Sequence, residues 1–123
     1  MKVLLSIKPE FVEKIFAGTK KYEFRKSLFK RDGVKYVVIY ASAPIKGVVG
    51  EFKIGHVLSD SVDIIWEKTK AHSGITKKFY KSYFKNKKVA NAIQIEHIKK
   101  YEETRPLSDY NIKHAPQSFC YID

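Results

Sequence analysis

The sequence of 123 residues contains a single cysteine, Cys120. One thiol excludes an internal disulfide and a cysteine-rich zinc site, and it fits a reducing compartment. The four histidines, at positions 56, 72, 97 and 114, show no close pairing of the metal-binding kind. We therefore expect a cytoplasmic protein that holds no metal and uses no cofactor.

Long apolar runs are also missing from the chain. No segment approaches the roughly 20 apolar residues that span a bilayer. The opening residues 1–8 are apolar over only a few positions, which is too short for a secretory signal. These features predict no membrane partner.

Arginine and acidic residues are few, and most of the charged residues are lysines. Lys and Arg total 24, of which only 3 are Arg, against 13 Asp and Glu, so the formal net charge is +11. Such an excess indicates an anionic partner, most often nucleic acid. The lysine-rich usage of an A/T-rich genome is the alternative explanation. The charge is uneven, because residues 68–100 hold 10 Lys and one Glu.

Apolar periodicity predicts five or six strands and about three helices. Alternating or continuous apolar runs predict strands near residues 3–7, 20–26, 35–41, 47–57, 90–98 and 118–122. Helical spacing predicts helices between residues 9 and 18, 59 and 72, and 75 and 88. With no linker or repeat, we expect one α+β domain over residues 1–123, a small, mostly antiparallel β-barrel with peripheral helices.

The densest polar cluster is the segment Gly-Thr-Lys-Lys-Tyr-Glu-Phe-Arg at residues 18–25. Glu23 and Arg25 are two residues apart, so on a strand they share one face. Together with Lys20 they can hold a phosphate, a base edge or a polar small molecule, since the carboxylate accepts from amino groups and the cations bind oxygens. A surface Glu–Arg pair of little energetic consequence is the alternative.

The spacing Gly-x-Lys-x-x-Glu-x-Arg, filled by Gly18, Lys20, Glu23 and Arg25, resembles the signature of the ASCH domain family. That family belongs to the PUA-like superfamily of small β-barrels. The resemblance extends along the chain through residues 5–9, 40–44, 49–52 and 115–119.

The resemblance implies a cleft beside the barrel that binds RNA or a nucleotide-like ligand. Lys20, Glu23 and Arg25 carry over directly as ligand-binding residues. Polar residues that adjoin apolar strands could also face the cleft, and the alternative for each is a satisfied turn or cap position. These further candidates are Ser6, Lys8, Ser42, Gln117 and Ser118.

Some proteins that resemble this family are enzymes, so a hydrolase is the alternative function. In the acetylcytidine amidohydrolases the chemistry is assigned to a Lys, a Thr and a Glu. Lys20 would match the Lys, but Glu23 stands where the Thr would fall, and no acid stands within residues 71–74. Lys20 and Glu23 could still act on RNA or a modified nucleoside through general acid/base chemistry with water as the nucleophile.

The predicted helix at residues 75–88 carries the second candidate surface. Five lysines recur along one side of it, where they could follow phosphates. Tyr80 and Tyr83 flank this side and could stack on exposed bases. A solvated lysine face and an aromatic core stripe are the alternatives. The five lysines are Lys77, Lys78, Lys81, Lys85 and Lys88.

Overall fold

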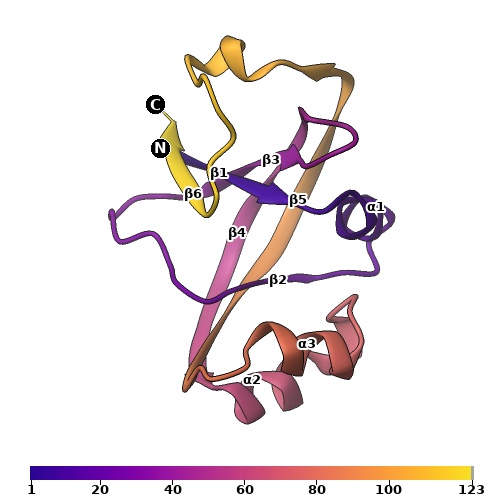
Figure 1. The fold of residues 1–123 in the computed structure, drawn as a ribbon, viewed down its shortest axis with the longest axis vertical. Coiled ribbons are helices and arrows are strands. Elements are labelled where there is room, and N and C mark those ends of the chain that lie inside the picture. Colours follow the sequence, from indigo (N-terminus) through magenta and orange to yellow (C-terminus); the bar gives the residue numbers. More distant parts are fainter. Residues whose placement is uncertain (123) are drawn as a thin grey trace.

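A computed structural model describes residues 1–122, which form six strands, three α-helices and two short 3-10 helices (Figure 1). The strands are β1 (Lys2–Ile7), β2 (Tyr22–Arg25), β3 (Tyr36–Ala41), β4 (Gly47–Ser61), β5 (Val89–Arg105) and β6 (Phe119–Ile122). The helices are α1 (Pro9–Ala17), α2 (Val62–Thr69) and α3 (Lys77–Tyr83), with 3-10 turns at Lys70–His72 and Leu107–Tyr110. The chain therefore belongs to the α+β class, as predicted.

The six strands form one sheet in the order β2-β5-β4-β3-β1-β6. β1 and β3 run parallel, and the other neighbouring pairs are antiparallel. Within residues 1–122 the sheet does not close, because no backbone ladder joins β2 to β6, so the expected barrel is not confirmed. The edge strand β2 has only four residues, and its last one, Arg25, reaches across the opening with its side chain instead.

Three apolar clusters hold the sheet and its coverings together. Alternate residues of β1 and β3 pack against α1, which buries Val12 and Ile15. Leu4 and Val38 point to the opposite face, where the segment around the Leu107–Tyr110 turn covers them. Because both faces are covered, β1 and β3 read as nearly continuous apolar runs rather than alternating ones.

The third cluster joins α2 and α3 to the other end of the sheet. Trp66 of α2 and Tyr80 of α3 pack against Phe24 of β2, with the Phe24 and Tyr80 ring centroids 5.2 Å apart. Tyr80 is fully buried, so the expectation that it stacks on bases is wrong.

Helix α3 is shorter than the predicted helix over residues 75–88. It ends at Tyr83, and Asn86 takes a left-handed conformation with φ of 66°, which turns the chain toward β5. Lys85 and Lys88 therefore follow the helix rather than lying on its face. β4 and β5 are longer than predicted, because their polar outer ends pair with each other from Val48↔Arg105 to Ser61↔Val89.

None of the helices within residues 1–122 is both long and apolar enough to span a membrane.

Candidate functional site

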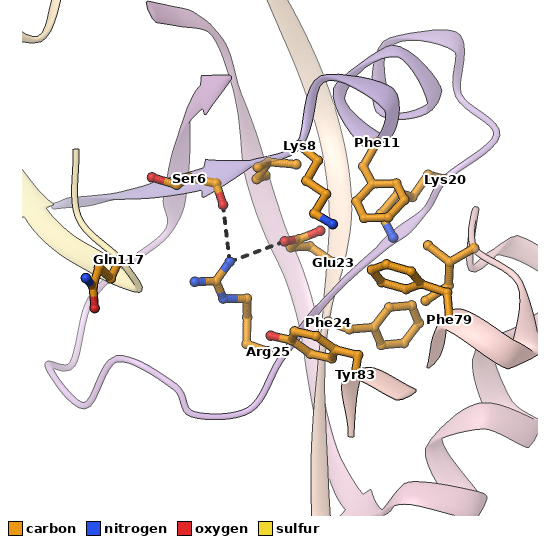
Figure 2. A pocket seen from close by; sticks show the side chains of 12 residues that line it. Ser6, Lys8, Phe11, Lys20, Glu23, Phe24, Arg25, Phe79, Tyr83 and Gln117 are labelled. Carbon is orange, nitrogen blue, oxygen red and sulfur yellow. Dashed lines mark hydrogen bonds and ion pairs between the residues drawn. The ribbon is translucent and has the colours of Figure 1, made fainter. Parts of the chain in front are cut away.

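A cleft of about 250 Å³ opens beside β2, between α1 and α3 (Figure 2). Its volume is slightly below that of a typical small-molecule pocket. The polar residues that line it are Ser6, Lys8, Lys20, Glu23, Arg25 and Gln117. The apolar residues are Ile7, Phe11, Phe24, Ile75, Phe79 and Tyr83.

The Lys20 side chain is directed inward by the end of α1. Gly18 adopts a left-handed conformation with φ of 82°, and the N–H groups of Thr19 and Lys20 both bond to the Lys14 carbonyl. This αL ending is a common helix stop, and glycine adopts it without the strain that a Cβ brings. The chain then turns into β2 with Lys20 only 1% exposed.

The Lys20 ammonium group lies among aromatic rings. Its Nζ is 5.2 Å from the Phe11 ring centroid and 4.9 Å from that of Phe24. It donates one hydrogen bond, to the Ser73 carbonyl at 2.8 Å. Burial lowers the pKa of Lys20 to about 8, because desolvation penalises the charged form more than the nearby Glu23 carboxylate favours it.

The segment at residues 72–74 holds this position through three consecutive carbonyl groups. In chain order they accept the Lys21 N–H at 2.8 Å, the Lys20 Nζ at 2.8 Å and the Lys14 Nζ at 2.9 Å. Gly74 has φ of 69°, and a Cβ there would stand 2.5 Å from the Lys20 Cβ. A glycine is therefore required for this segment to lie directly on the lysine.

Glu23 lies on the floor of the cleft and is 6% exposed. Its carboxylate accepts a long hydrogen bond of 3.4 Å from Arg25, which confirms that the two side chains share one face. Burial raises the pKa of Glu23, while the positive charges of Lys20 and Arg25 oppose the rise. The cleft thus contains an acid and an amine whose pKa values both move toward neutrality.

Arg25 bridges the open edge of the sheet. Its Nη2 donates to the Ser118 carbonyl at 2.7 Å. Its Nη1 donates to the Ser6 carbonyl at 3.5 Å, as Figure 2 shows. Asn91 on β5 in turn bonds to the Arg25 carbonyl at 3.2 Å. The guanidinium therefore connects β2, β1 and the segment that precedes β6, at the point where the backbone ladder is missing.

The rim of the cleft is aromatic. Phe79 and Tyr83, one turn apart on α3, have nearly parallel rings at an angle of 9° with centroids 6.4 Å apart. Lys8 Nζ lies 5.1 Å from the Phe79 centroid, and Lys26 Nζ lies 4.7 Å from that of Tyr83. Both rings are half-buried, so each retains a surface for contact.

Most of the predicted site residues meet in the cleft, but two do not line it. Ser118 contributes its carbonyl to Arg25, and Ser42 uses its N–H to bond to the Ile7 carbonyl at the end of β3. Sequence reasoning missed the aromatic wall formed by Phe11, Phe24 and Phe79. The available signal was the spacing of Phe79 and Tyr83, which is also that of a core stripe.

The basic surface lies outside this cleft. Lys77, Lys78 and Lys81 are on α3, and Lys85 and Lys88 follow it, all of them exposed. Lys81 forms an ion pair with Asp63 of α2. The hydrogen bond and charge of Lys81, with a smaller contribution from Lys77, lower the pKa of Asp63. Acidic residues of α2 therefore offset part of the positive charge.

Across residues 1–122, no three His, Cys, Asp or Glu side chains converge as metal ligands.

Comparison with known proteins gives both sequence and structural matches. The chain is 30% identical over 120 residues to the large ribosomal subunit protein uL22 of Ureaplasma parvum, a match that covers 98% of this chain and 39% of that protein. The chain thus spans about two fifths of the length of this relative. An ASCH domain-containing ribonuclease of Zymomonas mobilis is 24% identical over 116 residues, which cover 94% of this chain and 76% of that protein.

The fold matches the crystal structure of ASCH from Zymomonas mobilis with a TM-score of 0.89 and 22% identity, over 99% of this chain and 87% of that one. The open mixed sheet is therefore an architecture found in a solved structure. The sequence profile of the ASCH domain matches residues 5–99, which span the motif at residues 18–25 and most of the sheet. The resemblance seen in the sequence is confirmed: the chain belongs to the ASCH domain family.

Proposed function

We propose that this chain is an RNA-binding module, acting as one domain over residues 1–123, whose cleft receives one unpaired nucleotide. The observation that carries the proposal is the Glu23 carboxylate, which is buried at the floor of an open cleft and, among residues 1–122, accepts only a long bond from Arg25. A buried carboxylate gains from further donors. The amino group of a nucleobase is such a donor.

The remaining parts of the cleft suit the rest of a nucleotide. The half-buried rings of Phe79 and Tyr83 offer flat faces on which a base can stack. Lys8 is exposed at the rim, while Lys20 and Arg25 carry positive charge inside, so sugar and phosphate oxygens meet cations on several sides. Ser6 and Gln117 add polar groups to the same wall.

The exposed lysines on and after α3 would attract the RNA backbone without reading sequence. They lie outside the cleft, so their contribution is to strength of binding rather than to choice of ligand. The name of the Zymomonas relative, a ribonuclease, supports an RNA partner over other polyanions.

The test measures binding of a fluorescent single-stranded RNA octamer by anisotropy at several salt concentrations. We expect affinity to fall steeply with salt, and Glu23→Gln to weaken binding more than Lys53→Gln, a change of an exposed lysine on β4. An affinity that does not change with salt concentration, or equal effects of the two substitutions, would contradict the proposal.

A hydrolase acting on RNA or a modified nucleoside is the second candidate. The observation that favours it is the pair of Lys20 and Glu23, whose pKa values shift in opposite directions within one cleft. Glu23 would move a proton to or from water, and Lys20 would stabilise the developing negative charge.

Incubation with end-labelled RNA and with acetylcytidine separates the two candidates. Product that forms with the unchanged chain and disappears with Glu23→Gln supports the hydrolase. Tight binding of RNA with no product from either substrate supports the binding module.

A further inference from the structure

The Lys20 side chain is buried and held by a backbone carbonyl, an arrangement that a lysine supplying charge alone does not need. We propose that its Nζ is an amine nucleophile that forms an imine with an aldehyde ligand in the cleft. The substrate class is a sugar-phosphate with an open-chain aldehyde, such as an abasic nucleotide. This inference rests on the proposed function only for the nucleic-acid nature of that ligand.

The surroundings of Nζ favour the neutral amine. The side chain is 1% exposed and lies between the rings of Phe11 and Phe24, yet it lines the open cleft. A lysine that is desolvated in an apolar pocket is a known way to obtain a nucleophilic amine. With the pKa of Lys20 at about 8, roughly a tenth of the molecules carry the neutral amine at pH 7.

The hydrogen bond to the Ser73 carbonyl also suits a nucleophile. Both an ammonium and a neutral amine can donate to a carbonyl, so the 2.8 Å bond survives loss of the proton and continues to orient Nζ. Gly74 permits this contact, because a Cβ at that position would collide with the Lys20 side chain. Ser73 and Gly74 are thus positioning residues for the amine.

Charged groups from the neighbouring elements set the proton balance. β2 supplies Glu23 and Arg25, and α1 supplies Lys14, whose charge disfavours a proton on Lys20. The segment at residues 72–74 faces Nζ with a carbonyl rather than a charge. Glu23, whose pKa is raised, is the carboxyl group that lines the same cleft and interacts electrostatically with Lys20.

The reaction balances without any further reagent. The lone pair of neutral Nζ attacks the aldehyde carbon, the carbonyl π bond opens, and one proton moves from the nitrogen to the oxygen by way of Glu23 to give a carbinolamine. The Glu23 carboxylic acid donates a proton to the carbinolamine oxygen, which leaves as water when the C–O bond breaks. The nitrogen loses a proton to the Glu23 carboxylate, so the products are an imine and one water molecule.

A sugar-phosphate aldehyde fits the remaining groups of the cleft. The cations Lys8 and Arg25 flank the space beside Lys20 and suit phosphate oxygens. An abasic nucleotide supplies an aldehyde between two phosphates, and without a base it can place its sugar deeper than an intact nucleotide can. An apolar aldehyde would bring no anionic oxygen to these cations.

The experiment traps the imine with sodium cyanoborohydride. The full chain is mixed at pH 7–9 with an RNA octamer that carries one abasic nucleotide, and the covalent product is mapped by peptide mass spectrometry. We expect a single adduct on Lys20, with at least tenfold less product for Lys20→Arg, which keeps the charge but cannot form an imine. The matched control Lys21→Arg, at an exposed neighbour, should react like the unchanged chain.

Three outcomes would overturn the inference: no adduct, an adduct spread over exposed lysines, or equal yields from the unchanged chain and Lys20→Arg. Peptide mapping of the unchanged chain stays decisive even if a variant fails to fold. Pyridoxal 5′-phosphate, a phosphorylated aldehyde that is not a nucleic acid, is the second probe. Selective labelling of Lys20 by this probe, without binding of intact RNA, would retain the nucleophile and contradict the proposed RNA function.

Discussion

Lys20 in the cleft and Lys81 on α3 both have a partner, but the two partners differ in kind. Lys20 is buried and donates to a backbone carbonyl, whereas Lys81 is exposed and pairs with the Asp63 carboxylate. A group that is largely removed from water depends on its hydrogen-bond partner, while a surface ion pair contributes little. The backbone fixes the position of the positive charge inside the cleft, whereas the charge of Lys81 outside it is paired with another exposed side chain.

The largest expected effect comes from breaking the bridge at the open edge. Arg25→Met removes the bonds to Ser118 and Ser6 and leaves Glu23 without the cation that is hydrogen-bonded to it. Loss of one member of a buried pair costs about 3–5 kcal/mol of unfolding free energy. Urea unfolding measures the change.

The control for that measurement is Lys21→Met, at an exposed lysine one residue from the motif lysine. It should stay within about 0.5 kcal/mol of the unchanged chain. If Arg25→Met were as mild as this control, the guanidinium would not hold the sheet edge.

The second prediction concerns the pH dependence of stability. The fold lowers the pKa of Lys20 from 10.5 to about 8, so between these pH values the unfolded chain holds a proton that the folded chain lacks. Stability from this group therefore rises with pH across the window, by about 3 kcal/mol in total. Below pH 8 the cost of the buried ammonium is fully present.

The other lysines titrate as well, so the measured quantity is a difference between variants. Between pH 8 and 10.5 the unfolding free energy of the unchanged chain should rise relative to that of Lys20→Met, whereas Lys21→Met should run parallel to the unchanged chain. Parallel curves for all three proteins would show that the Lys20 amine is not desolvated.

A smaller effect is expected from the aromatic rim. Phe79→Ala removes one stacking face from the cleft, which weakens binding of single-stranded RNA by about 1–3 kcal/mol, or roughly fivefold to 150-fold. Tyr36→Ala changes an aromatic residue on β3 that is 37% exposed and does not line the cleft. Anisotropy titrations that gave the same loss for both variants would place the RNA elsewhere.

The smallest effect is expected from the exposed lysines on and after α3, which fall into two sets. Replacing Lys78, Lys85 and Lys88 with Gln should flatten the slope of log affinity against log salt by about 2 if each meets one phosphate. Replacing Lys77 and Lys81, which lie beside the acidic residues of α2, should change the slope by less than about 1. Equal slopes per lysine in the two sets would mean that Asp63 and Glu67 do not compete with the RNA.

The sequence predicted the elements around the cleft well because their signals are local. Pro9 and Gly18 bound α1 as expected, and the two-residue spacing of Glu23 and Arg25 placed them on one face. The end of α3 was harder to place, because the aromatic and lysine spacing continues past Tyr83 while Asn86 turns the chain. Periodicity reports which residues can share a face, and it does not report where the backbone leaves the helix.

The roles of Lys20 and Arg25 could not be predicted, since they depend on partners far away in the chain. Lys20 meets Ser73 and Arg25 meets Ser118, and these contacts exist only once the segments at residues 72–74 and before β6 are in place. A motif shows which side chains are brought together, whereas their burial and bonding follow from tertiary structure. For the same reason the sequence does not show that the Arg25 side chain, rather than a backbone ladder, spans the opening of the expected barrel.

The pairing of β1 with β6 has a mechanical consequence for any larger assembly. Lys2 faces Ile122 across this ladder, so both ends of the described chain lie side by side (Figure 1). β1 has Lys2 near one end and the cleft residue Ser6 near the other, separated by about 13 Å of extended strand. A tether attached at either end would pull on the same corner of the sheet, and the load would enter β1 and β6 at the Lys2–Ile122 pair, at the end of β1 away from the cleft residue Ser6.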